Sequence, residues 1–436
     1  MRPRRATVVV DLGFGDAGKG AVTDALTRAR GVTLVVRFNG GAQAGHNVVT
    51  RAGVHHTFAQ FGAGTLAGAR TLLSRFVVVH PTALAIEARH LEAKGISHAI
   101  EGVMIDERAL VTTPWHQAAC RLRELARGGE RHGSCGVGVG ETVADSLADE
   151  SMALRTGDLR DRIRLRKRTL RHRDAKRTAL AELAGVIPEA DEWRTFEDDA
   201  IVDAWIDAAI GVAACVHDER AIDDVIAAQT ELVFEGAQGV LIDEDHGFHP
   251  HTTWSHCTFE NALTILREHR FDGAIERRGI HRTHAVRHGA GPFPTEDPSL
   301  ELAELHNAHG PWQGGVRFGH RDLVLLRYAI AACGGVDALG ITHLDRVVPS
   351  SKVAVAYEAA MPRDLAMRDL AGRIGSLRSV ARADLRHAER LGRALRDVVP
   401  VLEPWPTALV PWLERTLGRR VTVRGRGPTA EDYRFS

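Results

Sequence analysis

A glycine-rich turn near the amino terminus constrains the fold of this chain more than any other feature. The sequence Gly13-Phe-Gly-Asp-Ala-Gly-Lys19-Gly20 follows an apolar run at Thr7–Asp11 and precedes a stretch of helical periodicity at about residues 21–30. A second apolar run, Leu34–Phe38, completes a strand, turn, helix, strand unit. Such units build parallel sheets. We therefore expect an α/β fold with a large, mainly parallel central sheet and a P-loop-like phosphate-binding turn.

The rest of the chain alternates β-rich runs with longer stretches of helical periodicity, which supports the same fold class. The β-rich runs are Phe76–His80, Val103–Asp106, Glu231–Phe234, Ala338–Thr342 and Val353–Tyr357. Residues 159–229 are charged and Ala-rich, which predicts a helical subdomain; its basic run Arg160–Arg177 has the composition of a solvated helix face. Asp364–Leu417 also has a helical pattern, and Arg420–Gly425 has that of a last short strand. We expect one domain over residues 1–436 with helical insertions.

Charge and cysteine usage exclude several classes of protein. The 436 residues include 56 Lys and Arg and 56 Asp and Glu, so no net charge attracts nucleic acid or an anionic membrane. The five cysteines are far apart and form no C-x-x-C pair, which argues against disulfides or a thiolate zinc site and favours a reducing cytoplasm. No segment approaches the ~18 apolar residues of a membrane-spanning helix. We expect a cytoplasmic protein whose phosphate chemistry comes from a local site.

The first glycine-rich loop has the P-loop spacing G-x-x-x-x-G-K. Backbone N–H groups around Gly15, Gly18 and Gly20 can surround phosphate oxygens at the start of the helix, and Lys19 adds a positive charge. Gly20 stands where an ordinary nucleoside triphosphatase has the Ser or Thr that holds Mg²⁺, while a carboxylate, Asp16, lies inside the loop. Asp16 could bind the cation or act as a general base, since nearby cationic groups would keep it ionised. A purely structural turn is the simpler alternative.

A second glycine-rich segment, Asn39-Gly-Gly-Ala-Gln-Ala-Gly45-His46-Asn47, directly follows the next strand. Two such loops at adjacent strand ends would converge on one crevice, where ligands bind in open α/β sheets. Most of the 23 histidines are expected to be structural or surface residues. His46 differs because a donor beside a phosphate-binding loop can stabilise charge that develops on a transferred phosphoryl group.

The two loops together resemble the paired signatures G-D-E-G-K-G and G-G-x-N-A-G-H-T of the adenylosuccinate synthetase family. Later segments agree with that family in order and spacing: Phe234–Asp243, Asp245–Gly247, Gly289–Glu296 and Thr342–Asp345, with a weaker echo at Gly425–Pro428. The resemblance covers about Val8 to Tyr357. It implies a carbon–nitrogen ligase that uses GTP and Mg²⁺ and forms a homodimer.

The resemblance also implies a reaction and roles for individual residues. The family transfers the γ-phosphoryl group of GTP to the 6-oxygen of IMP, and the amine of L-aspartate then displaces phosphate to give an N-succinyl product. By position, Asp16 would remove the purine N1 proton and ligate Mg²⁺ together with the Gly45 carbonyl. His46 would act as the acid near the transferring group, with Lys19 on the phosphates, and Gln238 would hydrogen-bond the base near its reacting oxygen.

Other positions correspond to binding residues of the family. Asp345 would accept hydrogen bonds from guanine N1 and N2, which adenine cannot supply, so GTP is favoured over ATP. His343 replaces a family lysine and could stack on the base in its place. Gly427 belongs to the C-terminal echo on the cofactor side. Thr253 corresponds to a threonine that contacts the substrate phosphate.

The expected acceptor pocket departs from the family pattern. The family's Asn-Ala-Gly-His begins here with Gln43, and the loop Gly133–Gly138 carries Ser134 and Cys135 where the family has two threonines, the second of which touches the 5′-phosphate. The family's arginine that reaches this phosphate across the dimer falls on Met152. Losing a charge-assisted phosphate contact costs roughly 1.5–3 kcal/mol, which favours a different ligand.

The family's aspartate-binding loop, Thr-Thr-Gly-Arg-x-Arg, reads Trp312-Gln-Gly-Gly-Val-Arg317, so only its last arginine remains. Trp254 and Trp312 lie where the family has small polar residues, and would either narrow the pocket or pack as ordinary apolar side chains. The stretch Asp243–His251, with His256 and Cys257, has residue types that bind metals. Most of it overlays a family loop that lines the substrate site without a transition metal.

The sequence thus predicts a GTP- and Mg²⁺-dependent ligase that joins L-aspartate to a non-standard purine nucleotide or a nucleoside-like acceptor. Two alternatives stay open: a divergent housekeeping enzyme that acts on IMP, and a non-catalytic GTP-binding homologue. A pure binder would need neither Asp16 nor His46, and both are present.

Overall fold

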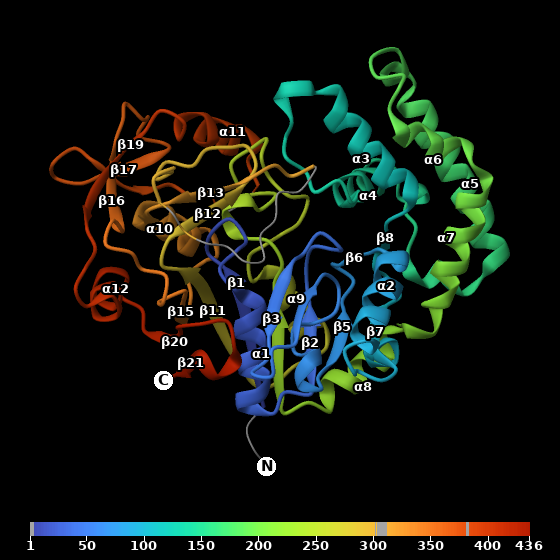
Figure 1. The fold of residues 1–436 in the computed structure, drawn as a ribbon, viewed down its shortest axis with the longest axis horizontal. Helices are drawn as coiled ribbons and strands as arrows, with labels where there is room; N and C mark the ends of the chain where they lie inside the picture. Colours follow the sequence, from blue (N-terminus) through green and yellow to red (C-terminus); the bar gives the residue numbers. More distant parts are fainter. Residues whose placement is uncertain (1–3, 301, 303–311, 381–382) are drawn as a thin grey trace.

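The computed structural model describes residues 4–300, 302, 312–380 and 383–436. Its centre is a ten-stranded sheet in the order β21-β20-β15-β11-β1-β10-β2-β5-β7-β9 (Figure 1). Neighbouring strands of this sheet run parallel except β20 and β21, so the predicted α/β fold with a mainly parallel sheet is confirmed. The strands are β1 (Arg5–Asp11), β2 (Leu34–Arg37), β5 (Arg70–Leu73), β7 (Val103–Asp106), β9 (Val216–His217), β10 (Glu231–Glu235), β11 (Ala274–Arg282), β15 (Ala338–Thr342), β20 (Val421–Gly425) and β21 (Tyr433–Phe435).

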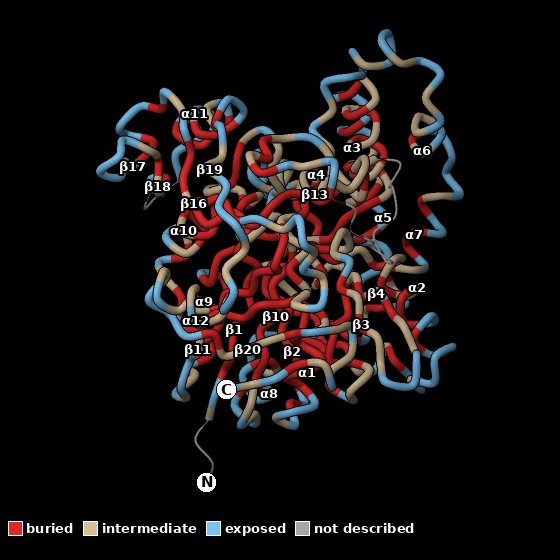
Figure 2. The backbone as a smooth tube through the Cα atoms, turned by 60° about the vertical axis from the view of Figure 1, so that its left-hand side comes forward, coloured by how far each residue is buried: buried red, intermediate tan, exposed pale blue. Residues whose placement is uncertain are grey.

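The central strands are buried on both faces, which is why they read as continuous apolar runs (Figure 2). Side chains alternate along β1: Val8 and Val10 belong to the large core that includes helices α9 and α10, while Val9 packs in a second core with Val22 and Leu26 of α1. The helices are α1 (Lys19–Arg30), α2 (Pro81–Glu92), α3 (Pro114–Ala126), α4 (Val139–Ala148), α5 (Arg162–Ala179), α6 (Arg194–Glu197), α7 (Asp199–Gly211), α8 (Glu219–Ala227), α9 (Glu260–Glu268), α10 (Leu323–Ala332), α11 (Leu385–Ala394) and α12 (Leu409–Leu417).

The strands that flank the first helix are not neighbours. We expected the two glycine-rich loops at adjacent strand ends, but β10 lies between β1 and β2 and pairs with both. This expectation was wrong because a strand from much later in the chain inserts between them. The insertion places the turn after β10 between the two loops.

Helices α5, α6 and α7 lie together at one end of the molecule, opposite the strands and helices of the C-terminal part (Figure 1). α5 starts after Asp161, whose side chain accepts from the N–H groups of Ile163 and Arg164 and caps the helix. These helices occupy the region of the predicted helical subdomain. The division of the chain into one domain with this subdomain stays a prediction.

Residues 364–417 were expected to be helical, and this was wrong in part. They contain β17 (Ala366–Arg368), β18 (Ile374–Leu377) and β19 (Val399–Pro404) besides α11 and α12. The strands join β14 (Arg321–Asp322) and β16 (Lys352–Glu358) in a second sheet. The helical pattern misled because these strands are short and have little β pattern of their own, so tertiary pairing outweighs the local pattern.

Strand β11 was missed although it lies beside β1. Its sequence AIERRGIHR contains four charged residues and no apolar run, so no strand was expected there. Such residues can lie in this strand because contacts within the fold hold the arginines. The expected strand Phe76–His80 shrinks to β6 (Val78–Val79), which pairs with β8 (Leu110–Val111). Two antiparallel pairs were also missed, β3 (His46–Val49) with β4 (His55–Phe58) and β12 (Ala285–His288) with β13 (Val316–Gly319).

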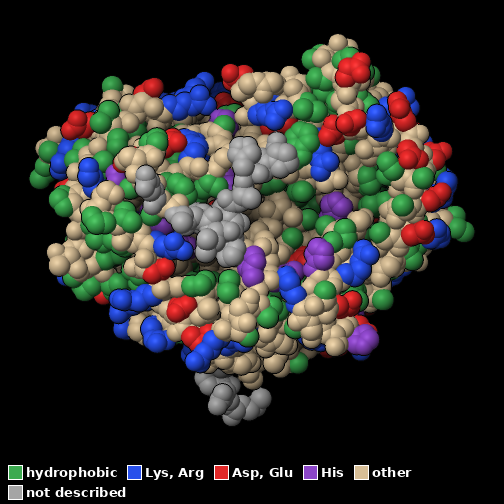
Figure 3. Space-filling view, in the orientation of Figure 1, with side chains coloured by type: hydrophobic (Ala, Val, Ile, Leu, Met, Phe, Trp, Pro, Cys, Tyr) green, Lys and Arg blue, Asp and Glu red, His purple; other side chains and the backbone are tan. Residues whose placement is uncertain are grey.

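No helix in the described ranges is long and apolar enough to cross a membrane. On the face that Figure 3 shows, basic and acidic side chains are interspersed, as the zero formal charge of the chain predicts. That face presents no broad basic surface of the kind that nucleic acids bind.

Candidate active site

The first glycine-rich loop joins β1 to α1, and its lysine is engaged inside the protein. The Lys19 residue is only 2% exposed; its ammonium donates to the Gly15 carbonyl at 2.6 Å and to the Asp11 carboxylate at 3.0 Å. Asp11 also accepts from the backbone N–H groups of Gly13 and Ala17, each at 2.7 Å. Asp11 therefore accepts hydrogen bonds from loop N–H groups and from the Lys19 ammonium, which we expected to bind phosphate. The sequence analysis missed it, although a carboxylate at the end of the strand before a P-loop is a visible signal.

Asp16, the predicted base and Mg²⁺ ligand, meets a histidine from β12. His288 donates from Nε2 to the Asp16 carboxylate at 2.7 Å. Burial raises the pKa of Asp16, but the hydrogen bond and charge of His288, with the charges of Arg282 and Lys19, outweigh burial and lower the pKa to about 2. Asp16 is therefore ionised at neutral pH, as a base and a metal ligand both require. His288 was not predicted, because it is 272 residues away in sequence.

His46 begins β3 and is oriented by a buried carboxylate. Its Nδ1 lies 2.7 Å from Oε1 of Glu235, the last residue of β10, and the other Glu235 oxygen accepts from the Ala63 N–H at 2.9 Å. Burial lowers the pKa of His46 despite the opposing charge of Glu235. Burial raises the pKa of Glu235, but the charge and hydrogen bond of His46 outweigh it, so that pKa is lowered. Glu235 fixes Nδ1 as the donor and leaves Nε2 to face a substrate.

Close backbone contacts bring the loops together. A Cβ on Gly20 would lie 2.8 Å from Cβ of His46, which explains why no Ser or Thr stands at this P-loop position. A Cβ on Gly15 would lie 3.4 Å from the Gln238 backbone, and one on Gly40 would lie 2.7 Å from Oε1 of Gln238. The two glycine-rich loops and the Gln238 turn therefore touch one another at the carboxyl ends of β1, β10 and β2.

Two amide side chains near this point have buried oxygens without a partner. Among the described residues, Oε1 of Gln43 and Oε1 of Gln238 accept no hydrogen bond. Gln238 also has a positive φ of 56°, a conformation that is uncommon outside glycine and is often found at functional sites. Both oxygens could accept from a ligand, which agrees with the substrate-binding roles predicted for them.

The predicted guanine-binding segment lies against the first loop. A Cβ on Gly18 would be 3.5 Å from Thr342 and 3.6 Å from the His343 ring. His343 has a φ of 58°, and its Nδ1 lies 2.8 Å from the Thr342 hydroxyl. Asp345 follows two residues later, and Gly427 comes just after β20, the strand that pairs with β15. The residues expected to bind the nucleotide base therefore gather on this side of the loop.

The loop 133–138 approaches Asp16 from the opposite side. Burial raises the pKa of Cys135 to about 12, with smaller contributions from Cys120 and from the charge of Asp16, so the thiol is neutral. The Ser134 hydroxyl lies 3.2 Å from Sγ of Cys120. A Cβ on Gly136 would be 2.7 Å from the Trp312 ring, which packs directly over this loop.

Arg317, the arginine kept from the expected aspartate-binding loop, is bound within the protein. Its guanidinium forms a bidentate pair with Glu296 at 2.8 and 2.5 Å. It also donates to the carbonyls of Gly289 and Gly291 at 2.9 and 3.0 Å. A substrate carboxylate would have to displace Glu296 to reach it.

The remaining predicted contacts lie on the segment after β10. The Thr253 N–H donates to the Ile242 carbonyl at 2.8 Å, and its residue is partly exposed. Trp254 is 45% exposed, and a Cβ on Gly140 would lie 2.8 Å from its ring. Trp254 therefore covers the start of α4 at the rim of the site.

Sequence and structure comparisons agree with this geometry. The family model described as adenylosuccinate synthetase matches residues 8–396. The chain belongs to the adenylosuccinate synthetase family. An adenylosuccinate synthetase of Thermosynechococcus vestitus is 34% identical over 375 residues, covering 80% of this chain and 77% of the relative. One of Myxococcus xanthus is 33% identical over 361 residues, covering 80% of each.

Solved structures show the same fold at lower identity. Fully ligated adenylosuccinate synthetase from Plasmodium falciparum superposes with a TM-score of 0.78 at 18% identity over 99% of both chains. The succinoaminodeoxyadenylate synthetase of cyanophage S-2L, bound to dGMP and to dATP as an energy donor, gives a TM-score of 0.60 at 17% identity, covering 100% of this chain and 96% of that one.

Membership of the adenylosuccinate synthetase family makes this protein a carbon–nitrogen ligase that uses GTP and Mg²⁺. The residues present fit both groups. The Asp16 carboxylate is ionised, and α1 begins at the loop with its N–H groups toward the site, where a helix end attracts phosphate. Lys19 can reach phosphate oxygens by exchanging Asp11 for them. The individual roles of these side chains stay predictions.

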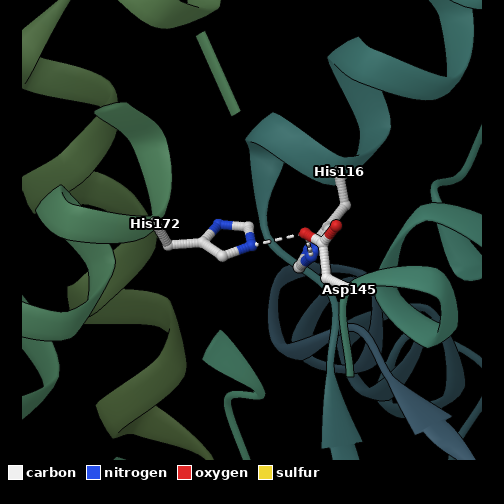
Figure 4. A group of neighbouring side chains, drawn as sticks. All are labelled: His116, Asp145 and His172. Carbon is white, nitrogen blue, oxygen red and sulfur yellow. Dashed lines mark hydrogen bonds and ion pairs between the residues drawn. The ribbon is translucent and has the colours of Figure 1, made fainter. Parts of the chain in front are cut away.

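A second group of side chains has metal-ligand spacing but is a hydrogen-bonded network. Nε2 of His116 and Nε2 of His172 lie 3.3 and 3.0 Å from the same oxygen of Asp145 (Figure 4). The Lys176 ammonium lies 2.7 Å from the other oxygen. Nδ1 of His116 accepts from the Thr113 N–H at 3.0 Å, so its proton is on Nε2, which donates to Asp145 and cannot hold a metal. The network joins α3, α4 and α5.

The histidine-rich stretch after β10 forms no such cluster. Among the described residues, the group with metal-ligand spacing contains no member of the stretch 243–257. His249 pairs instead with the Glu244 carbonyl at 2.6 Å, and His256 lies 3.3 Å from Asp245. The role of this segment in lining the substrate site stays a prediction.

Proposed function

We propose that this protein phosphorylates a carbonyl oxygen of a purine-like acceptor with GTP and replaces that oxygen with the amine of L-aspartate, and that its acceptor is not IMP. The reaction type follows the family. The difference in acceptor rests on the rebuilt surroundings of loop 133–138, which in the family holds the 5′-phosphate of IMP.

The observation that carries the acceptor proposal is the neutral, half-buried Cys135 in that loop. Its thiol, with a pKa raised to about 12, replaces a hydroxyl that would donate to phosphate, and thiols are weak donors. Met152, in the turn after α4, replaces the expected cation. A phosphate bound here would lose contacts worth roughly 1.5–3 kcal/mol each. The cyanophage synthetase, bound to dGMP, supports the idea that this fold accepts purines other than IMP.

Different residues of the chain carry out different steps of the proposed reaction. Asp16 removes the proton from the acceptor nitrogen next to the carbonyl, so that the carbonyl oxygen attacks the terminal phosphorus and GDP leaves. His46, held by Glu235 through Nδ1, donates from Nε2 to the phosphoryl oxygens once it is doubly protonated, a form that the Glu235 carboxylate and the phosphate charge both stabilise. Mg²⁺, when bound, neutralises the phosphate charge that develops. The aspartate amine then displaces phosphate from the ring carbon, while the Gln238 amide positions the base.

A divergent IMP enzyme is the second candidate, because one cation reaches loop 133–138 from another element. Arg121 of α3 donates to the Gly136 carbonyl at 3.0 Å and lies 5.3 Å from the Trp312 ring centroid. A small rotation would let it contact an acceptor phosphate and replace the missing arginine.

An acceptor panel separates these candidates. The purified protein is incubated with GTP, Mg²⁺ and L-aspartate, and with IMP, dGMP, GMP or unphosphorylated purine nucleosides, and N-succinyl product is measured by mass. We expect the highest kcat/KM on an acceptor other than IMP. Efficient turnover of IMP alone contradicts the acceptor proposal. Absence of product with every acceptor contradicts the ligase proposal and favours a non-catalytic GTP-binding homologue.

A further inference from the structure

Asp16 lines a pocket together with several residues to which the sequence analysis assigned no role. The space within it, counting the part that is open to solvent, is about 520 Å³. One wall carries Phe14 and Asp16 of the first loop, and the other carries Leu325 and Leu326 of α10. Arg321, from the short strand β14, also lines it.

Arg321 is a buried cation without an acidic partner. The residue is 3% exposed, and its guanidinium donates to the Arg282 carbonyl at 3.1 Å and to Nδ1 of His281 at 2.7 Å. Its Nε has no partner, and no carboxylate lies within ion-pair distance of it in the part of the chain that the structure describes. Burial alone lowers the pKa of Arg321 to about 9. A buried charge of this kind is costly unless an anion compensates it.

The neighbouring residue Asp322 does not compensate the charge of Arg321. The Asp322 carboxylate accepts from the Leu325 N–H at 2.9 Å and from the Tyr357 hydroxyl. Burial raises the pKa of Asp322 to about 6, and Arg321 is not among the groups that shift it. The missing anion must therefore come from outside the described fold.

A carboxylate of the amine donor fits this position. The ligase reaction brings a small dicarboxylic amino acid to Asp16, and Asp16 lines the same pocket as Arg321. The arginine that the sequence assigned to this donor, Arg317, is held by Glu296. Arg321 offers the planar, multiple N–H donors that suit a carboxylate, and its site is already dehydrated.

We propose that Arg321 binds a carboxylate of the amine donor in the pocket beside Asp16, and that it replaces the arginine loop used for this purpose elsewhere in the family. This inference rests on the proposed function, since it assumes an amino-acid co-substrate. Arg321 is then a residue that determines donor affinity, separate from the residues that bind the nucleotide.

Steady-state kinetics of Arg321→Met test the proposal. The KM for L-aspartate should rise about 10- to 100-fold, because a charge-assisted contact is lost, while the KM for GTP and for the acceptor stay within about 3-fold of wild type. Arg327→Met is the matched control: this α10 arginine donates only to the carbonyls of Val355 and Gly375. It should leave the KM for L-aspartate unchanged.

A conservative variant keeps the test decisive if Arg321→Met does not fold. Arg321→Lys retains the charge but loses the bidentate geometry, so the KM for L-aspartate should rise by about 3- to 10-fold. An unchanged KM in Arg321→Met, or in Arg321→Lys if the methionine variant is unfolded, overturns the proposal.

A binding measurement distinguishes this inference from the proposed function. Succinate is a dicarboxylate without the reactive amine, and millimolar succinate should raise the melting temperature of the wild type and of Arg327→Met but not that of Arg321→Met. No stabilisation of the wild type, or equal stabilisation of all three proteins, overturns the proposal. If no acceptor supports turnover while succinate still acts through Arg321, the proposed function fails and the carboxylate site stands.

Discussion

At the scale of single residues, the site depends on side chains whose charge state is set by partners on other strands. Asp16 is kept ionised by His288, and His46 is oriented by Glu235. Both partners approach from strand ends that lie far from the glycine-rich loops in sequence. The loops therefore carry the side chains that we propose to react, while β10 of the parallel sheet and β12 of the β12–β13 pair supply their partners.

Asp16→Asn tests the base directly. The amide cannot accept the acceptor's proton, so product formation should fall by about 10²- to 10⁴-fold. GTP binding, measured by equilibrium dialysis without Mg²⁺, should stay within about 3-fold of wild type, because the loop's N–H groups and Lys19 are unchanged. Activity equal to that of the wild type would refute the role of Asp16.

Glu235→Gln tests the orientation of His46. The amide keeps the shape but loses the charged acceptor of Nδ1, so kcat should fall about 10- to 100-fold with little change in the KM for GTP. Glu276→Gln is the control, since Glu276 contacts Arg278 and Thr7 at the other end of the sheet. Equal kcat values for the wild type and Glu235→Gln, in proteins of similar melting temperature, would contradict this role.

From the sequence, residues that stand inside motifs could be proposed for the site, but residues that only the fold brings close could not. Asp16, Lys19, His46 and Gln238 could be named because each lies in a glycine-rich segment of recognisable spacing. His288 and Glu235 could not be assigned their roles, since pairing across 272 and 189 residues leaves no local signal. The role expected of Arg317 stays a prediction, and a donor carboxylate would have to displace Glu296 from it.

At the scale of helices and strands, apolar runs predicted the buried parallel strands well. Strands with charged residues were not predicted. β7 and β15 have the bounds expected from the sequence, because their residues are buried on both faces. β11 was missed because its arginines and histidine pair inside the fold. The loop 133–138 enters α4, so its position depends on how α4 is held against α3 and α5.

The Asp145 network holds α4, and Asp145→Asn should loosen it. The variant removes the negative charge and one of the two oxygens that bind Lys176 and the two histidines, which should reduce the free energy of unfolding by about 2–4 kcal/mol at pH 7, measured by urea denaturation. Asp203→Asn is the control, because Asp203 forms an exposed pair with Arg166 that contributes about 0–1 kcal/mol.

The pH dependence of that stability difference has a defined sign. Burial raises the pKa of Asp145, but its hydrogen bonds to His116, His172 and Lys176 outweigh burial, so the pKa is lowered from the ordinary value of 3.8. A carboxyl whose folded-state pKa is lowered contributes stability above its unfolded pKa and loses it as the pH falls. The difference between the wild type and Asp145→Asn should therefore be largest near neutrality and shrink below about pH 4. A difference that grows on acidification would contradict the network.

At the scale of the whole molecule, we propose a homodimer, as the family resemblance implies. Leu147 on α4 and Ile163 on α5 are 71% and 86% exposed in the single chain, and we expect a partner subunit to cover them. Light scattering after size-exclusion chromatography should give twice the chain mass of 47.5 kDa. A mass of one chain at all concentrations would contradict the dimer.

The transfer of oxygen from acceptor to phosphate tests the central claim most directly. The acceptor identified in the panel is labelled with ¹⁸O at its reacting carbonyl and incubated with GTP, Mg²⁺ and L-aspartate. If Asp16 and His46 direct the terminal phosphoryl group to that oxygen, each released phosphate carries the label and the N-succinyl product carries none. Unlabelled phosphate, formed by attack of water on GTP, would contradict the account.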